Sequence, residues 1–292
     1  MNSGLLALQV EVFRRLRRTP WSVYDAPGMR IVFVVIVALF ALPAAAVEMK
    51  ALQASARGFP QMRDLAGAPI ADGNLAQWVE GGLLHLKLVF EYGDGRHTEE
   101  TAVLRQEPEV AQVSWLYVDR RGETVLRRFE VNFTTGHATA QKTGDRGGTW
   151  DEKMDIEPGH TFAGLGFVIA LVNLRDRLVA GEKIQLKAVA FTPKPRGATV
   201  TLSREASELL HMGGRSLESD RFVIHPEVPF IAKLFIKVPD QRLWLYKTPP
   251  AGFMRGELPA AETSDPLMRI DVLPSAPSAA AAAAAAKSSA PR

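Results

Sequence analysis

The chain has 292 residues, no cysteine, and a formal charge of +3 from 35 basic and 32 acidic side chains. The absence of cysteine excludes disulfides, thiolate metal sites, a cysteine nucleophile and a lipid-modified N-terminal cysteine. Five of the basic and two of the acidic residues lie in the first 46 residues, which leaves 30 of each in residues 47–292. Residues 47–292 therefore carry no net charge, and such a chain has no electrostatic basis for binding nucleic acid or an anionic membrane surface.

Residues 29–46 have the three parts of a secretory signal peptide. A short basic start at Met29 is followed by the apolar run 31–42 and then by a proline and three alanines. The small residues at its end fit the A-x-A rule and predict signal cleavage between Ala46 and Val47. We therefore expect a periplasmic or otherwise exported protein.

The preceding residues 1–28 leave two alternatives open, because they contain four arginines. Either Met29 is the true start, or residues 1–28 are a basic extension ahead of an uncleaved inner-membrane anchor. Both alternatives place the body outside the cytoplasm, since a cationic flank stays on the cytoplasmic side. Without cleavage, residues 31–47 would make the membrane contact, although spanning a bilayer takes roughly 20 apolar residues.

Two further segments are predicted to lack a packed fold. Residues 47–75 form a lead-in in which glycine and proline interrupt any regular element. Residues 275–292 are rich in alanine, proline and serine, with eight consecutive alanines at 279–286. Such a run without an apolar face is a marginal helix in water, so we expect a disordered tail or flexible stalk.

The segment between them, residues 76–274, is dominated by two-residue alternation. Leu84, Leu86, Leu88 and Phe90 alternate with mostly polar neighbours, which predicts a half-buried strand at 84–92. Glycine-bearing turns join such segments into an antiparallel meander. Further strands are expected at 97–106, 113–117, 125–133, 137–142, 183–191, 198–203, 220–225, 242–246, 252–258 and 267–273.

One segment breaks the alternation. Residues 160–178 contain eleven consecutive apolar or small residues, too few to span a membrane, which predicts a buried helix with Thr161 as N-cap and Gly181 as its stop. Residues 226–237 predict one or two amphipathic helical turns. The expected fold class is α+β: a long curved antiparallel sheet of about ten strands, an open or half β-barrel, wrapped around one buried apolar helix.

Residues 222–259 (FVIHPEVPFIAKLFIKVPDQRLWLYKTPPAGFMRGELP) resemble the C-terminal region of uncharacterised exported bacterial β-sheet proteins of unknown function. The order of strands, apolar helix and strands resembles the periplasmic lipoprotein-carrier superfamily, whose members are incomplete β-barrels closed by helices. The resemblance implies an apolar half-barrel that binds acyl chains, but it carries no functional residue over. The helix at 162–172 departs from that plan, because a helix of this size can fill the cavity itself.

Motifs for catalysis and metal binding are missing. The chain has no G-x-S-x-G, H-E-x-x-H, P-loop or G-x-G-x-x-G motif, and its six histidines form no close ligand pair. We therefore expect no catalytic residue, no metal and no cofactor. An acidic loop with oxygen ligands for calcium was the best cation candidate, but its spacing is not that of an EF-hand and Arg146 and Lys153 compete for it. Its acidic residues are Asp145, Asp151, Glu152, Asp155 and Glu157.

The first functional hypothesis is a non-catalytic exported protein that holds a lipid or other apolar ligand in its curved sheet. The apolar helix would act as a plug or lid that the ligand displaces. Aromatic residues at every second position of a strand belong to the hydrophobic core more often than they contact a ligand. The expected ligand contacts are Trp115, Phe129, Val131, Leu165, Phe167, Ile169 and Leu171.

Two alternatives come from other classes. The protein could be an envelope structural or assembly protein that contacts partner proteins through its sheet edges and tail. It could also be a hydrolase with a site built from His225, Glu227 and Asp240, if these three side chains cluster in a cleft. Exposed sheet edges allow dimerisation, but nothing in the sequence specifies an oligomeric state.

Overall fold

The computed structural model describes residues 46–144, 147–192, 194–212, 214–227, 239–248 and 252–272, which belong to one compact unit, Ala44–Arg292. The predicted basic extension, the signal or anchor segment up to residue 45, most of the insert 226–237 and the tail 275–292 lie outside the described residues. Among the described residues, no helix is long and apolar enough to cross a membrane.

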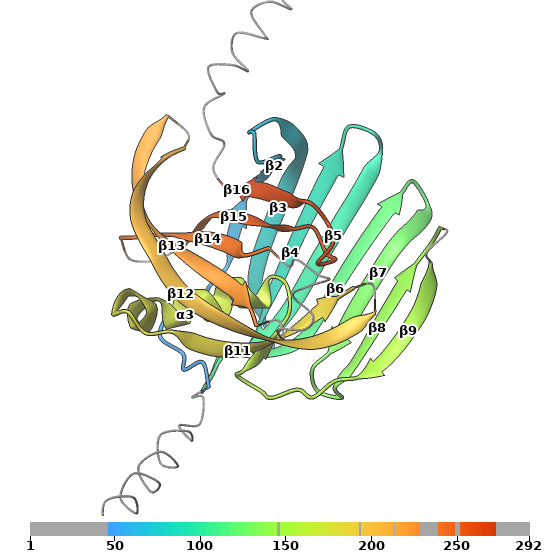
Figure 1. Cartoon of the computed structure of the whole chain (residues 1–292), viewed down its shortest axis with the longest axis horizontal. Coiled ribbons are helices and arrows are strands. Elements are labelled where there is room, and N and C mark those ends of the chain that lie inside the picture. The colour runs from blue at the N-terminus through green and yellow to red at the C-terminus, as the bar shows by residue number, and fades with distance from the viewer. Residues whose placement is uncertain are drawn as a thin grey trace, which may run out of the picture. The chain divides into compact units, whose positions relative to one another are not determined.

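The described chain forms one 16-stranded sheet and one helix (Figure 1). The sequence-based fold class is confirmed in outline, although the sheet has more strands than the ten expected. In chain order the elements are β1 (Ala56–Gly58), β2 (Gln61–Arg63), β3 (Pro69–Glu80), β4 (Leu83–Tyr92), β5 (Arg96–Arg105), β6 (Ala111–Arg121), β7 (Thr124–Asn132), β8 (His137–Lys142), β9 (Gly148–Lys153), β10 (Thr161–Phe162), α3 (Gly166–Val179), β11 (Ile184–Phe191), β12 (Pro195–Met212), β13 (Arg215–Pro226), β14 (Gln241–Tyr246), β15 (Phe253–Pro259) and β16 (Leu267–Asp271).

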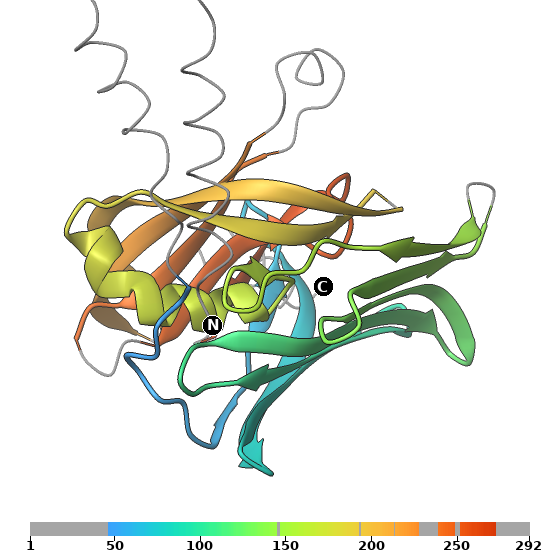
Figure 2. The ribbon, with the colours of Figure 1, turned by 90° about the horizontal axis from the view of Figure 1, so that it is seen from below.

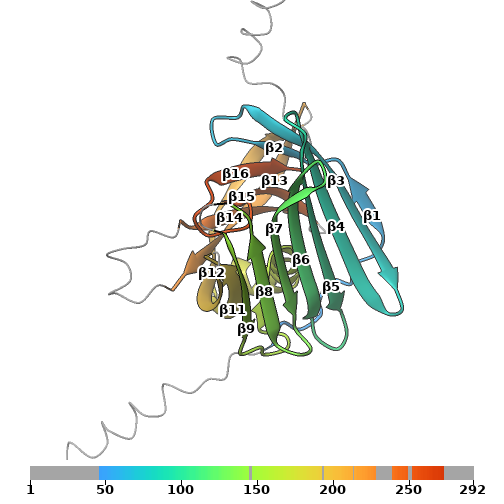
Figure 3. The ribbon, with the colours of Figure 1, turned by 90° about the vertical axis from the view of Figure 1, so that its right-hand side faces the viewer.

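The strand order is that of a meander closed between its last and first strands. Strands β2 to β9 lie side by side in chain order, as Figure 3 shows for β3 to β9. Strands β10 to β16 follow one another in the same way, and β16 pairs with β2 through Ile270 and Met62. All pairs are antiparallel except β10 with β11. The C-terminal strands thus continue the sheet that the N-terminal strands begin.

The free edges of the sheet are β9 and β10, which are consecutive in the chain. Only residues 154–160 join them, and an extended chain of that length spans about 25 Å at most. Among the described residues, ion pairs rather than a backbone ladder link β11 and the turn after it to β9 and to the segment 154–160. The Nζ of Lys187 lies 2.7 Å from Asp155 and 2.6 Å from Glu157, and that of Lys194 lies 2.6 Å from Glu152. The sheet is therefore curved and open along this seam.

The helix α3 lies between the β11–β14 layer and strands β4 to β6 (Figure 2). Ile169, Leu171, Leu174 and Leu178 are nearly inaccessible and share one core with the inner faces of both strand layers. The prediction of a buried helix is thus confirmed. Gly181, with φ +94°, follows the helix as predicted, and its N–H donates to the carbonyl of Leu178.

The predicted start of the helix was wrong. Thr161 lies in β10, and its hydroxyl accepts a hydrogen bond from the backbone N–H of Glu157, so it closes the preceding turn instead of capping α3. The helix begins at Gly166 without a side-chain cap. The apolar run misled the prediction because it continues without a break through β10 and the turn that leads into α3.

The lead-in expected at 47–75 contains two short strands and the first part of a third. Its glycines and prolines were read as breaks, but they fall between short strands: Gly58 ends β1, Pro60 lies between β1 and β2, and Pro69 begins β3. The carbonyl of Pro60 accepts a hydrogen bond of 2.7 Å from the N–H of Gly73 in β3. Proline is tolerated at strand ends, where it interrupts no ladder.

The hairpin β12–β13 is longer than the two short strands expected there. Residues 204–211 are mostly polar and gave no apolar alternation, yet they pair with β13 across the hairpin. Cross-strand polar contacts stabilise this part. Asp220 accepts hydrogen bonds from Arg204 at 3.1 Å and Ser207 at 2.6 Å, and Arg221 contacts Glu208 at 3.0 Å. Such pairs add to the packing of Leu210 and Met212, which are buried with Trp244 and Met254 in a small apolar cluster.

Candidate functional site

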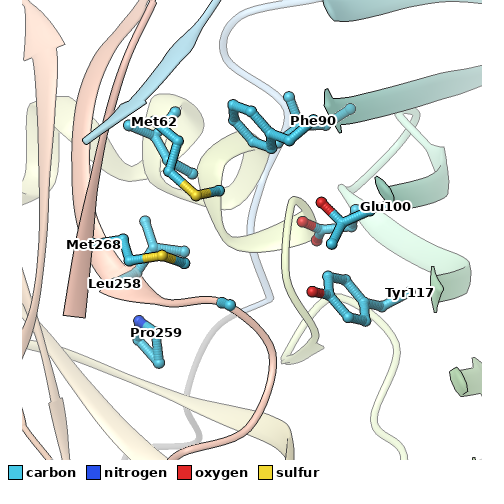
Figure 4. Close-up of a pocket in the computed structure, with 11 residues that line it drawn as sticks. Met62, Phe90, Glu100, Tyr117, Leu258, Pro259 and Met268 are labelled. Carbon is cyan, nitrogen blue, oxygen red and sulfur yellow. The ribbon is translucent and has the colours of Figure 1, made fainter. Parts of the chain in front are cut away.

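A pocket lies between strands β4–β6 on one side and β2, β15 and β16 on the other (Figure 4). Its cavity volume is about 30 Å³, and the pocket is partly open to solvent. Most of its wall is apolar, and three side chains bring polar atoms to it: Thr98, Glu100 and Tyr117. The complete lining is Met62, Leu88, Phe90, Thr98, Glu100, Tyr117, Leu258, Pro259, Ala260, Met268 and Ile270.

The strand register explains why these side chains share a face. Leu88 in β4 is the Cα partner of Glu100 in β5, and Glu100 is the partner of Tyr117 in β6. Directly opposite residues of an antiparallel pair project to the same side of the sheet. Phe90 and Thr98 form the next row in the same way. The pocket floor is thus a regular patch of the inner sheet face.

The Glu100 carboxyl is held at this floor by two hydrogen bonds to one oxygen. Its Oε1 accepts from the indole Nε1 of Trp115 at 2.7 Å and from the backbone N–H of Leu165 at 2.8 Å. Burial raises the pKa of Glu100, and these two hydrogen bonds only partly oppose that effect. Among the described residues, no cation pairs with this carboxyl.

The Tyr117 hydroxyl is the second polar group of the pocket. The side chain is only 4% exposed, and its hydroxyl has no hydrogen-bond partner among the described residues. Figure 4 shows the carboxyl of Glu100 and this hydroxyl facing Met62, Leu258 and Met268 across the pocket. Burial raises the pKa of Tyr117, against the opposing charge of Arg127. A buried hydroxyl without a partner is energetically costly, which marks this position as one that a ligand can satisfy.

The loop between β15 and β16 closes the pocket from the side of Pro259 and Ala260. Charged side chains tie it to the strands opposite. The guanidinium Nη1 of Arg127 lies 3.2 Å from Glu262 and 2.9 Å from Asp265, and the Nζ of Lys142 lies 2.6 Å from Glu262. The backbone N–H of Thr263 also donates to the carbonyl of Phe191 at 3.0 Å.

This ion-pair cluster is balanced in charge. Asp119 of β6 accepts from Arg127 and also from Arg96, whose guanidinium lies 2.7 Å from both carboxylate oxygens. Arg96, Arg127 and Lys142 thus face Asp119, Glu262 and Asp265. Glu262 and Asp119 are almost fully buried, at 2% exposure each. We call these six side chains the strap cluster, since they hold the β15–β16 loop across the inner sheet face.

The seven ligand contacts expected from the sequence come together, but none of them lines this pocket. Five are buried in the main core, and Leu165 and Phe167 pack against it partly buried. The rings of Trp115 and Phe129 both stack on Phe191, with centroids 5.4 Å and 4.7 Å away. Leu165 also packs against the smaller cluster that forms the pocket wall. The helix occupies the space in which the sequence placed a ligand.

The turn before α3 fits against the pocket floor only because Gly164 has no side chain. A Cβ there would overlap the Oε1 of Glu100 and the Nε1 of Trp115, and the backbone has φ +47°. Gln112 binds the same turn from the other side, with its Oε1 accepting from the N–H of Ala163 at 2.8 Å and its Nε2 donating to that residue's carbonyl at 3.1 Å.

Gly164→Ala is therefore expected to destabilise the protein more than Gly181→Ala. At Gly181 a Cβ meets nothing within 4 Å, so the variant has only the left-handed backbone to accommodate, a cost of about 1–2 kcal/mol. At Gly164 the overlap adds about 1–3 kcal/mol to that cost. Urea unfolding of both variants measures the difference. Equal losses would mean that the turn is not packed against Glu100 and Trp115.

The three residues of the hydrolase hypothesis do not form a cleft. The Nδ1 of His225 and the Oδ1 of Asp240 lie 2.7 Å apart, but Glu227 instead accepts a hydrogen bond of 2.7 Å from the hydroxyl of Thr201. His225 and Glu227 are exposed, and none of the three lines the pocket. The arrangement matches a surface ion pair beside a strand end.

The acidic loop is engaged in ion pairs. Asp151 contacts His137 at 3.1 Å, and Glu152, Asp155 and Glu157 contact the seam lysines described above, while Asp145 lies outside the described residues. No group of three or more histidine or acidic side chains within the described ranges is placed to hold a metal ion.

Sequence reasoning missed the polar members of the site, although the signal was present. In β5, Glu100 lies two and four residues before the buried Ala102 and Leu104, so its side chain points to the same inner face of the sheet. In β7, Arg127 lies two and four residues before the core residues Phe129 and Val131, so it points to that inner face as well. Charged residues at inward positions of a strand are informative because burial of an unpaired charge is costly.

Comparisons with known proteins leave the family open. No protein-family model matches the chain, and no curated protein matches it. A crystal structure of a β-barrel-like protein of the domain of unknown function DUF1849 from Brucella abortus is similar, with a TM-score of 0.42 and 10% sequence identity. The similarity covers 75% of this chain and 95% of that chain. Similarity at this level gives no basis for transferring a function.

Proposed function

We propose that the protein is a non-catalytic binding protein that binds the head group of a small ligand in the pocket between β4–β6 and β15–β16. The observation that carries the proposal is the buried hydroxyl of Tyr117, which lies at an apolar pocket without a protein partner. Binding sites for small molecules typically combine apolar walls with a few convergent polar groups. The Glu100 carboxyl and the Tyr117 hydroxyl are such groups.

The volume of the pocket limits the size of the ligand. The pocket has a cavity volume of about 30 Å³, far below the range of about 300–1,000 Å³ that is usual for ligand pockets, so only a small head group fits inside it. The main core beside it is filled by α3 and its neighbours, so a long acyl chain would need the helix to move. A small head group needs no such displacement, and we therefore favour a ligand that presents one over the lipid proposed from the sequence.

Export is part of the same proposal and is supported by the signal-like residues 29–46. If cleavage occurs after Ala46, the new N-terminus is Val47, which is fully buried and whose backbone nitrogen lies 3.0 Å from the carbonyl of Gly159. A peptidase needs an extended, accessible segment at the cut. Cleavage would therefore have to precede the docking of Val47 against the sheet.

Native mass spectrometry of the full-length protein, purified from its native envelope without denaturant, tests this proposal. We expect an added mass of one small molecule in the wild type. Ala260→Leu places a larger side chain at the pocket wall and is expected to reduce the bound fraction at least about tenfold, since overpacking there competes with the ligand. Ala56→Leu, at an exposed position of β1, is the matched control and should keep the added mass.

The proposal would be contradicted if none of the three proteins carried an added mass and none bound small apolar probes added to it. That result would favour the alternative of an envelope protein that acts through protein contacts alone.

A further inference from the structure

We infer that the ligand presents a protonated amine, a head group small enough for the pocket, to Glu100 and Tyr117. This inference rests on the proposed binding function and specifies its ligand class. It is carried by three features of the pocket: a carboxyl without a cationic partner, a buried hydroxyl without a partner, and two aromatic rings beside them, those of Phe90 and Tyr117.

The first feature is the charge of the pocket. Glu100 has one oxygen engaged by Trp115 and Leu165, which leaves Oε2 without a partner among the described residues. No lysine, arginine or histidine lines the pocket. A buried carboxylate is costly unless it is paired, so a ligand cation at Oε2 stabilises the charged form of Glu100, which no cation among the described residues does. A ligand carboxylate would instead meet a like charge.

The nearest cations of the chain are already neutralised. Arg127 lies 5.8 Å from the ring centroid of Tyr117, but its guanidinium is bound to Asp119, Glu262 and Asp265. Arg96 is bound to Asp119 as well. The strap cluster balances its own charge and leaves none to compensate Glu100.

The second feature is the hydrogen-bonding geometry. An ammonium group has three donors and no acceptor. One donor can bind Oε2 of Glu100, and another can bind the lone pairs of the Tyr117 hydroxyl, which faces the same space in Figure 4. Both groups come from facing positions of β5 and β6, so a single small head group can reach them together.

The remaining wall suits the rest of such a ligand. Aromatic faces attract cations, and thioether sulfurs are polarizable, so Phe90, Tyr117, Met62 and Met268 stabilise an ammonium group and its neighbouring methylenes. Leu258 and Ile270 provide apolar surface for the body. The pocket therefore has a carboxyl-bearing floor and an apolar opposite wall.

The test compares three probes with the same six-carbon chain and different head groups: hexylammonium, 1-hexanol and hexanoate. Isothermal titration of the purified full-length protein at pH 7 measures each dissociation constant. Hexylammonium is fully protonated there, because alkyl amines titrate near the lysine value. We expect it to bind about 10- to 100-fold more tightly than 1-hexanol, as for hydrogen bonds to charged groups, and hexanoate to bind most weakly.

Glu100→Gln keeps a carbonyl oxygen for Trp115 and Leu165 but removes the charge. It is expected to abolish the preference for hexylammonium over 1-hexanol. Glu99→Gln is the matched control, since Glu99 is the adjacent residue of β5, half-buried and paired with Lys87 at 2.7 Å, and should keep the preference. Tyr117→Phe tests the second head-group contact independently and is expected to weaken hexylammonium several-fold.

The outcomes separate this inference from the proposed function. Equal binding of hexylammonium and 1-hexanol, tighter binding of hexanoate, or an amine preference that survives in Glu100→Gln would overturn the inference and leave a binding pocket for another ligand class. Binding of none of the three probes, together with a bare native mass, would remove the proposed function itself.

Discussion

Replacing Arg127 with methionine is expected to lower the free energy of unfolding by about 3–5 kcal/mol, the range observed when one partner of a buried ion pair is removed. The arginine is the shared cation of Asp119, Glu262 and Asp265, and its side chain is 11% exposed. Methionine restores much of the volume but none of the five hydrogen-bond donors. Three carboxylates then face one another with only Arg96 and Lys142 to balance them.

Arg128→Met is the control for that measurement. Arg128 is adjacent in β7, faces outward, and forms an exposed ion pair with Glu130 at 2.8 Å. Its loss should change stability by no more than about 0.5 kcal/mol, as is usual for surface substitutions. Equal effects of the two variants in urea unfolding would mean that the strap cluster does not hold the β15–β16 loop to the sheet.

Replacing Phe129 with alanine is expected to lower the free energy of unfolding by about 3–5 kcal/mol, as for other large-to-small changes of buried aromatic residues. The ring is fully buried, and it stacks between Tyr117, with centroids 6.2 Å apart, and Phe191. Thermal or urea unfolding measures the loss. The matched control is Phe59→Ala, because Phe59 is 70% exposed and should contribute no more than about 0.5 kcal/mol.

The same variant distinguishes the two interpretations of Phe129. If the residue is core, stability falls and the affinity of the remaining folded protein for small probes changes little. A ligand contact would give the opposite pattern, in which probe binding is lost while the protein unfolds at nearly the wild-type urea concentration. That outcome would restore the sequence-based assignment of Phe129 to the binding surface.

Local pattern predicted the central part of the sheet well. Strand β8 was expected at its observed bounds, and β4, β5, β11 and β14 within one residue at each end. These segments alternate apolar and polar residues because one face of each is buried. The strands β1, β2 and β10 have only two or three residues, too few for a periodic signal. Strand β9 (GTWDEK) and the distal part of β12 are mostly polar.

The candidate site was less predictable than the fold. The alternation of side chains along β5 and β7 places Glu100 and Arg127 on the inner face of the sheet. It does not predict which residues they contact there. The strap cluster joins residues separated by up to 138 positions in the chain, such as Arg127 and Asp265. The pocket likewise needs Met268 opposite Glu100, a pairing that no local pattern contains.

By itself the sequence determined the inward face of most strands, the buried helix and the absence of disulfides, because each depends on residue type and on spacing within one element. The tertiary structure alone decided that β16 pairs with β2, that the residues expected to contact a ligand pack in the main core, and that a small pocket forms beside that core. Those features depend on how far the sheet curves and on which distant strands meet. Curvature and closure arise from the twist and packing of the whole sheet, which no single segment encodes.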